Sequence, residues 1–231
     1  MSRVRIHNFS ISLDGFATGE GQALDTPFGH AGHRLHEWML ATRFGRREVL
    51  GESGGTEGVD HVMADRHGPG IGAEIMGAGK FGPPGWQDDP EWRGWWGDNP
   101  PFHTPTYVLT HRPRPSLEME GGTTFHFVDA APADALEVAR DAAAGQDVRV
   151  GGGPTMMRAF LAAGLVDHLH VVLLLQRLQA VPQPNTAAEQ DRYLHDVQVV
   201  DEAGGEERAH HGRAPADADV LTGRCVPCHV E

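Results

Sequence analysis

Short runs of β-favouring residues alternate with segments of helical spacing up to about position 175. The runs at 4–13, 71–76, 106–110, 124–128, 148–150 and 169–175 predict strands. The helical spacing predicts helices over 34–43 and 59–66, from Pro132 to Gly145, and from Pro154 to Gly164. Strands and helices in this order predict an α/β fold, in which helices cover both faces of a mixed, mainly parallel sheet.

Two glycine-rich stretches interrupt these elements. Residues 51–58 predict a mobile loop. Residues 77–101 combine glycine and proline with Trp86, Trp92, Trp95 and Trp96. This composition predicts an ordered excursion that is packed by aromatic rings and contains no regular element.

The regular pattern ends after position 175. Residues 176–231 lack periodicity, contain Pro182 and Pro184, and carry paired acidic residues among scattered histidines. We therefore predict one domain over residues 1–175, followed by an atypical acidic tail over 176–231 that is partly disordered.

Composition narrows the class of protein. The formal net charge of -13 for 231 residues repels nucleic-acid backbones and anionic membranes. No apolar run approaches the roughly 20 residues that cross a bilayer, and the first residues lack the pattern of a signal peptide. We expect a cytoplasmic protein that acts on a small molecule and has neither a nucleic-acid nor a membrane partner.

Both cysteines lie near the C-terminus, in Cys225-Val226-Pro227-Cys228-His229. This spacing matches covalent haem attachment, and zinc binding together with His210 or His211 is a second interpretation. Haem attachment takes place outside the cytoplasm, and the chain shows no export signal. We favour a coincidence of spacing and expect no metal site.

The segment Gly151-Gly152-Gly153 follows a predicted strand and precedes a predicted helix. Backbone N–H groups at the positive end of a helix, with no side chains around them, are suited to binding a phosphate. A tight strand-to-helix turn without a ligand explains three glycines equally well. The spacing fits neither the Rossmann dinucleotide fingerprint nor a phosphate-loop lysine motif.

Three parts of the chain resemble the dihydrofolate-reductase-like family, which includes the reductase domain of riboflavin biosynthesis. They are Ser12-Leu13-Asp14-Gly15; Tyr107-Val108-Leu109-Thr110-His111 with Gly121-Gly122-Thr123-Thr124-Phe125; and residues 148–153 with Ala163-Gly164-Leu165-Val166-Asp167. The segment Trp95-Trp96-Gly97-Asp98-Asn99-Pro100-Pro101 resembles a subgroup of small bacterial members. The resemblance covers residues 4–175 and implies a three-layer αβα fold.

The resemblance also implies that NADPH lies across the carboxyl ends of the parallel strands. The contacts to its diphosphate would be Gly152, Gly153, Pro154 and Thr155, in the cofactor-binding turn that begins at Gly151. Thr110 with His111 or Arg112 would lie near its adenosine phosphate, and Gly77 would add one more contact. Relatives commonly have arginine after this last glycine, whereas this chain has Ala78-Gly79-Lys80. Lys80 is a candidate substitute, although it lacks the fork of arginine.

Asp14 is the candidate for orienting the substrate or relaying a proton. Its pKa is about 3.9 when unperturbed, so acid catalysis at neutral pH would require burial. An Asp-Gly turn that simply ends a strand is the alternative. The first strand also brings Ser12 to the sheet end where such sites lie, so Ser12 is a candidate substrate contact. Trp38 is a further candidate substrate contact. Together with Trp95, Trp96 and Phe102 it could form the wall of a pocket for a flat heterocycle, and ordinary packing is the alternative interpretation.

From these residues we predict an NADPH-dependent reductase of a small heterocyclic substrate, such as a pteridine or a ribityl-aminopyrimidine. The alternative is a non-catalytic nucleotide-binding or ligand-sensing module on the same fold. Folate reduction and the riboflavin-pathway step cannot be separated here, because a fold does not fix its substrate. The resemblance further implies a homodimer through the sheet edge.

The resemblance stops at Leu174-Leu175-Gln176-Arg177. Relatives continue there with a Pro-containing, glycine-rich stretch and an edge hairpin. Two hypotheses account for the break: a divergent cover for the sheet, or a shifted reading frame. Reading the other frames of the coding DNA beyond codon 175 distinguishes them, because a missing glycine-rich continuation would dismiss the frame shift.

Overall fold

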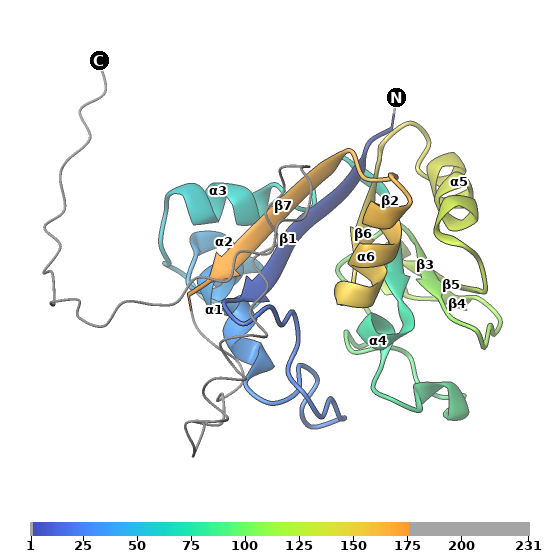
Figure 1. Cartoon of the computed structure of the whole chain (residues 1–231), viewed down its shortest axis with the longest axis horizontal. Helices are drawn as coiled ribbons and strands as arrows, with labels where there is room; N and C mark the ends of the chain where they lie inside the picture. Colours follow the sequence, from blue (N-terminus) through green and yellow to red (C-terminus); the bar gives the residue numbers. More distant parts are fainter. Residues whose placement is uncertain (1, 176–231) are drawn as a thin grey trace, which may run out of the picture. The chain divides into compact units, whose positions relative to one another are not determined.

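Seven strands form one sheet in the computed structural model, which describes residues 2–175 (Figure 1). The strands are β1 (Val4–Ser12), β2 (Ile71–Gly77), β3 (Pro105–Leu109), β4 (Leu117–Glu118), β5 (Thr124–Val128), β6 (Asp147–Gly151) and β7 (His168–Leu174). Their order is β4-β5-β3-β2-β6-β1-β7, and every neighbouring pair is parallel except β4 with β5. The predicted mainly parallel sheet is confirmed, and only β4 was not predicted.

Helices lie on both faces of this sheet, as predicted. The longer ones, α5 (Pro132–Ala142) and α6 (Pro154–Ala162), pack on one face (Figure 1). The other face carries α4 (Ala78–Phe81) and the N-terminal helical segment. That segment consists of η1 (Gly32–His36), α1 (Glu37–Leu40), α2 (Arg43–Glu48) and α3 (Val59–Asp65). Two further 3-10 turns are η2 (Trp86–Asp88) and η3 (Glu120–Gly122).

Each face of the sheet has its own hydrophobic core, because side chains alternate along a strand. On β2, Ile75 belongs to the core under α5 and α6, which also contains Phe160. The next residue, Met76, belongs to the opposite core with Phe81 and Phe125. Burial on both sides explains why the central strand β2, apart from Glu74, is apolar and does not alternate with polar residues.

The tryptophan-rich segment completes the second core, as its composition predicts. Trp86 is buried, and its Nε1 donates to the carbonyl of Ala78 at 3.1 Å. Trp96 packs edge-on against Phe102 with ring centroids 4.7 Å apart. The expectation that this segment lacks regular elements was wrong at α4 and η2.

The predicted single helix over 34–43 was also wrong. The chain forms η1 and α1 and then begins a new helix at Arg43. Thr42 causes this break: its backbone is extended, with φ -77° and ψ 161°, and its Oγ1 accepts the amide of Gly45 at 3.1 Å. A threonine in that conformation caps the next helix and cannot continue the previous one. The predictions for residues 176–231, Cys225 and Cys228 among them, lie outside the described residues.

Histidine side chains contact one another and Asn8 across the paired strands β1 and β7. A bulge shifts the register between Ile6 and Phe9, and Asn8 adopts a φ of 62° there. His170 Nδ1 lies 2.8 Å from Asn8 Oδ1, and His7 Nε2 lies 2.7 Å from His168 Nδ1. Burial, followed by the charges of Arg5 and of the two β7 histidines, lowers the pKa of His7 to about 4.

This lowered pKa predicts acid sensitivity. The folded state keeps His7 neutral, whereas the unfolded chain takes up its proton near pH 6.5. The stabilisation is therefore complete above about pH 6.5 and is lost as the pH falls toward 4. We expect the free energy of unfolding in urea to decrease over this range, and His7→Gln to reduce the slope. The same change at His33, which is exposed, should leave the slope unaltered; equal slopes in wild type and His7→Gln would contradict the assignment.

Candidate functional site

Four loops meet at the carboxyl ends of the central strands. The strands β3, β2, β6 and β1 are consecutive neighbours, with Gly77 opposite Leu109 and Met76 opposite Gly151. The last residues of these strands, the loops that follow them and the first turn of α6 (Pro154–Ala162) contain all but one of the predicted site residues; Trp38 comes from α1. Parallel strands end at the same edge of a sheet, so a site built from several loops is expected here.

The strand β1 extends farther than its neighbour β6 at this edge. Arg5 pairs with Arg149, and β6 ends two residues later at Gly151. β1 continues to Ser12 and pairs over that part with β7 alone. Strand pairing is therefore interrupted beyond Gly151, between the last part of β1 and the end of β2. The glycine turn, defined as Gly151, Gly152 and Gly153, lies at the base of this interruption.

The three glycines of the turn have different surroundings. A Cβ on Gly151 would lie 2.4 Å from Lys80 Nζ. Gly152 has a φ of +133°, and a Cβ there would lie 3.4 Å from the amide nitrogen of Gly77. Gly153 faces open space, with no atom within 4 Å of a built Cβ. Packing against Lys80 explains the glycine at 151, and the positive φ explains the glycine at 152. Only Gly153 leaves room for a ligand.

Helix α6 begins directly after this open position. Gly153 is its N-cap in extended conformation, no side chain caps the helix, and Pro154 occupies the first turn. The amides of Met156 and Met157 both donate to the carbonyl of Gly153, at 3.1 and 3.2 Å. Gly153, Pro154 and Thr155 are exposed. The positive end of the helix is therefore open to solvent and suited to an anion.

A buried ion cluster lies beneath the turn, and we call Glu74, Lys80 and Arg149 the Glu74 cluster. Glu74 has no exposed surface. Its Oε1 lies 2.5 Å from Lys80 Nζ, and its Oε2 accepts from Arg149 Nε at 2.8 Å and also from Arg149 Nη2. Burial alone would raise the pKa of Glu74, but the two cations hold it below its usual value. The cluster ties α4, β2 and β6 together next to Gly151.

Lys80 is thus engaged by a carboxylate, with its ammonium against Gly151. Burial lowers the pKa of Lys80, and the charge of Glu74 opposes that shift. The Phe102 ring lies 5.3 Å from its Nζ. Sequence reasoning considered Lys80 only as a phosphate contact and missed Glu74 and Arg149. A single glutamate in the apolar run Ile71–Gly77 was the available signal, because a buried charge needs a partner.

The loop after β3 forms an exposed ion pair and an exposed hydrogen bond. Arg112 Nη2 lies 2.6 Å from Asp88 Oδ1, and His111 Nδ1 lies 3.0 Å from Asp129 Oδ1. Thr110 is buried, and its Oγ1 accepts the amide of Arg112 at 3.2 Å. Solvent screens an exposed ion pair strongly, so another anion can readily replace Asp88 at Arg112.

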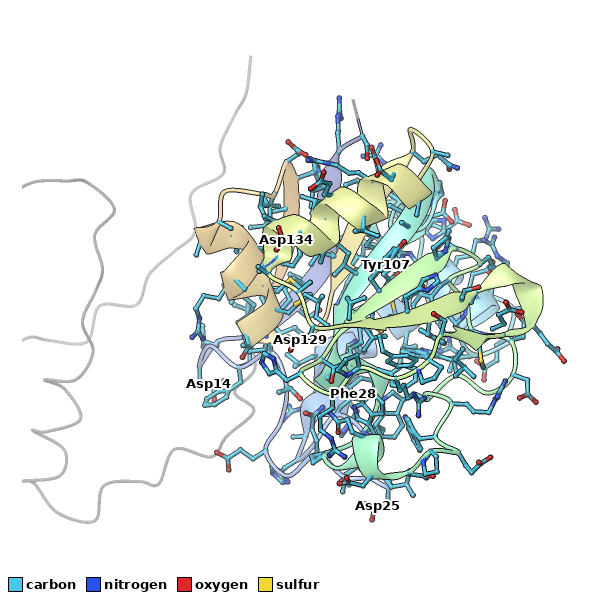
Figure 2. The ribbon with its side chains drawn as sticks, turned by 90° about the vertical axis from the view of Figure 1, so that its right-hand side faces the viewer. Asp14, Asp25, Phe28, Tyr107, Asp129 and Asp134 are labelled. Carbon is cyan, nitrogen blue, oxygen red and sulfur yellow. The ribbon has the colours of Figure 1, made fainter. Side chains whose placement is uncertain are left out.

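Asp14 lies in the loop after β1, at the same end of the sheet as Asp129 (Figure 2). Its Oδ1 accepts the hydroxyl of Ser12 at 2.5 Å, and that hydroxyl in turn accepts the amide of Phe16 at 3.0 Å. Ser12 is 2% exposed, so its hydroxyl is committed to this turn. Trp38 lies in α1 and contacts β1 two residues before Ser12, where its Nε1 donates to Ser10 Oγ at 3.0 Å.

A small pocket of about 210 Å³ flanks α4 at this end of the sheet. Its lining includes Gln22, Ala78, Gly79 and Trp86. Within residues 2–175, no group of three histidine, cysteine or acidic side chains is arranged to hold a metal ion. Over the same residues, no helix has the length and apolar character needed to cross a bilayer.

Comparison with known families agrees with the fold. The family described as the RibD C-terminal domain matches residues 4–174. The chain therefore belongs to the RibD C-terminal domain family, and the resemblance seen in the sequence is confirmed. This membership supports a reductase-like oxidoreductase of the riboflavin-biosynthesis type. A search of curated proteins finds no match.

The different surroundings of the glycines predict different costs of substitution. Gly151→Ala is expected to lower the free energy of unfolding by about 1–3 kcal/mol, because the methyl group must displace the Lys80 ammonium from buried Glu74. Gly153→Asn adds its side chain to open space and should change stability by less than about 0.5 kcal/mol. Urea unfolding measures both. Equal losses at the two positions would show that the Glu74 cluster does not determine the need for glycine at 151.

Proposed function

We propose that this protein is an NADPH-dependent reductase of a small heterocyclic substrate of the pteridine or ribityl-aminopyrimidine type. Family membership supports the reductase class. The observation that carries the proposal is the open, uncapped start of α6 at Gly153, next to the end of β2. A diphosphate fits such a site, because it accepts hydrogen bonds from backbone amides and its charge is favoured by the helix dipole.

The residues that would hold the cofactor come from two neighbouring loops. The turn would bind the diphosphate through the backbone of Gly152, Gly153 and Thr155. Arg112 would bind the phosphate on the adenosine by exchanging it for Asp88, at little cost in free energy because the pair is exposed. When bound, NADPH supplies the hydride that reduces the substrate.

Asp14 would position the substrate. Its carboxylate is held by the Ser12 hydroxyl, and this contact fixes the direction of the oxygens. A carboxylate accepts hydrogen bonds from ring N–H and amino groups, which both proposed substrate classes carry. The glycine turn and Asp14 follow β6 and β1, which are neighbours, so one ligand pair can reach both.

A second candidate function is a nucleotide-binding module without turnover. The observation that favours it is the engagement of the site's cations, since Lys80 is bound to Glu74 and Arg112 to Asp88. Turnover separates the two functions. Oxidation of bound NADPH in the presence of a pteridine or a ribityl-aminopyrimidine would eliminate the module.

A fluorescence titration with NADPH tests the proposed function directly. We expect the nicotinamide emission to change and to saturate at submillimolar cofactor. Absorbance at the NADPH band then follows oxidation during a screen of pteridines and ribityl-aminopyrimidines. An absence of saturable binding in the submillimolar range would refute both the reductase and the module.

Gly153→Asp separates the ligand role of the turn from its structural role. Aspartate is a favourable N-cap, so the variant should be as stable as the wild type or more stable by about 0.3 kcal/mol. Its carboxylate competes for the helix amides and repels a diphosphate, so NADPH should bind at least about tenfold more weakly. The neutral variant Gly153→Asn is the matched control and should retain most of the affinity. Equal affinities for the two variants would exclude the turn as the diphosphate site.

Arg112→Gln tests how the cofactor is selected. It should weaken NADPH binding by about tenfold or more, because one charge-assisted contact to the adenosine phosphate is lost. NADH has no such phosphate, so its affinity should change by less than about twofold. Arg93→Gln removes an exposed arginine from the tryptophan-rich segment and serves as the control. A parallel loss for both cofactors in Arg112→Gln would contradict this role.

A further inference from the structure

A second pocket lies at the opposite, amino-terminal end of the sheet. It has a volume of about 350 Å³ and is lined by residues from the first part of β1, the start of β7 and the end of α3. Its lining includes Arg3, Arg5, His7, Arg66 and His168. Arg5 precedes Ser12 by seven strand residues, or about 23 Å. This amino-end pocket is therefore separate from the glycine turn.

The arginines of the amino-end pocket are only partly satisfied by the described protein. Within residues 2–175, the guanidinium groups of Arg3 and Arg66 have no carboxylate within ion-pair distance. Arg5 Nη2 donates to the carbonyl of Pro69 at 2.8 Å, and its Nε lies 3.3 Å from Asp147 Oδ2 without forming a hydrogen bond. No residue in this range accepts from Arg5 Nη1.

The charge balance of the pocket lining differs from that of the chain. Acidic residues outnumber basic ones by 32 to 19 over the whole sequence, whereas the lining contains Arg3, Arg5 and Arg66 against two aspartates. Two of these three guanidinium groups lack a carboxylate among the described residues. The two carboxylates of the lining are already engaged, Asp65 with Arg47 and Asp147 with Arg5. The pocket therefore has unused cationic donors and no unused anion.

Two histidines, His7 and His168, also line this pocket. His7 Nε2 and His168 Nδ1 share one hydrogen bond at 2.7 Å, so only one of these two nitrogens carries the proton. Arg66 follows the end of α3 and His168 is the first residue of β7, and both line the pocket.

We propose that the amino-end pocket binds a small dianion of the phosphomonoester class. Guanidinium groups present planar pairs of N–H donors that match phosphate oxygens, and three of them surround this pocket. Its volume lies at the small end of ligand pockets, which suits a single phosphate-bearing metabolite and excludes a dinucleotide. The site is independent of the proposed cofactor site and does not rest on the reductase activity.

Calorimetry with inorganic phosphate and the full chain tests this inference. The titration is run at pH 7 in a phosphate-free buffer of low ionic strength, with sulfate and succinate as comparison arms. We expect one phosphate per chain, with sulfate competing and succinate binding more weakly. The double variant Arg3→Gln/Arg66→Gln should reduce phosphate affinity by about tenfold or more. Both arginines form no ion pair among residues 2–175, so circular dichroism should show an unchanged fold.

Two controls locate the binding event. Arg93→Gln should retain phosphate binding, which rules out a general loss of positive charge. Gly153→Asp should also retain it, because it blocks the glycine turn and leaves the amino-end pocket intact. The inference is overturned by an absence of phosphate binding at millimolar concentration. It is equally overturned by binding that survives the double arginine variant, or that is lost only in Gly153→Asp.

Discussion

The charge of Glu74 is the constraint on which the central part of this structure depends. A carboxylate with no exposed surface is tolerated in a sheet only when cations compensate it from within the protein. Arg149 provides two hydrogen bonds from the adjacent strand, and Lys80 provides the third from α4. This requirement fixes the short helix α4 against β2 and brings Lys80 over Gly151.

The same constraint separates the roles of the glycines that follow. Gly151 is bare because the Lys80 ammonium lies where its side chain would be, and Gly152 adopts a backbone conformation that favours glycine. Neither glycine needs a ligand to explain it. Gly153 does not share these requirements, and the exposed start of α6 behind it is the feature that points to an anion. Only Gly153 and the start of α6, and not all three glycines, therefore point to a ligand.

Much of the fold follows from local sequence, because β-branched runs, glycine stops and Pro154 mark strand and helix ends directly. The helix predicted over 34–43 failed because one hydrogen bond, from Gly45 to Thr42, outweighs the apolar spacing across it. At the site, the loop positions of Asp14, Gly77 and Thr110 follow from strand order. The partners of Glu74 do not, since Arg149 lies 75 residues away along the chain. No local pattern encodes such a pairing.

The central claim is that backbone amides after β6 hold the diphosphate of NADPH. Amide chemical-shift mapping on the ¹⁵N-labelled protein tests it without any assumption about the substrate. On addition of NADPH, the largest shifts are expected at the amides of Gly152, Gly153 and Thr155, with smaller ones at His111 and Arg112. Saturable binding that leaves the amides of 152–155 unshifted would contradict the account.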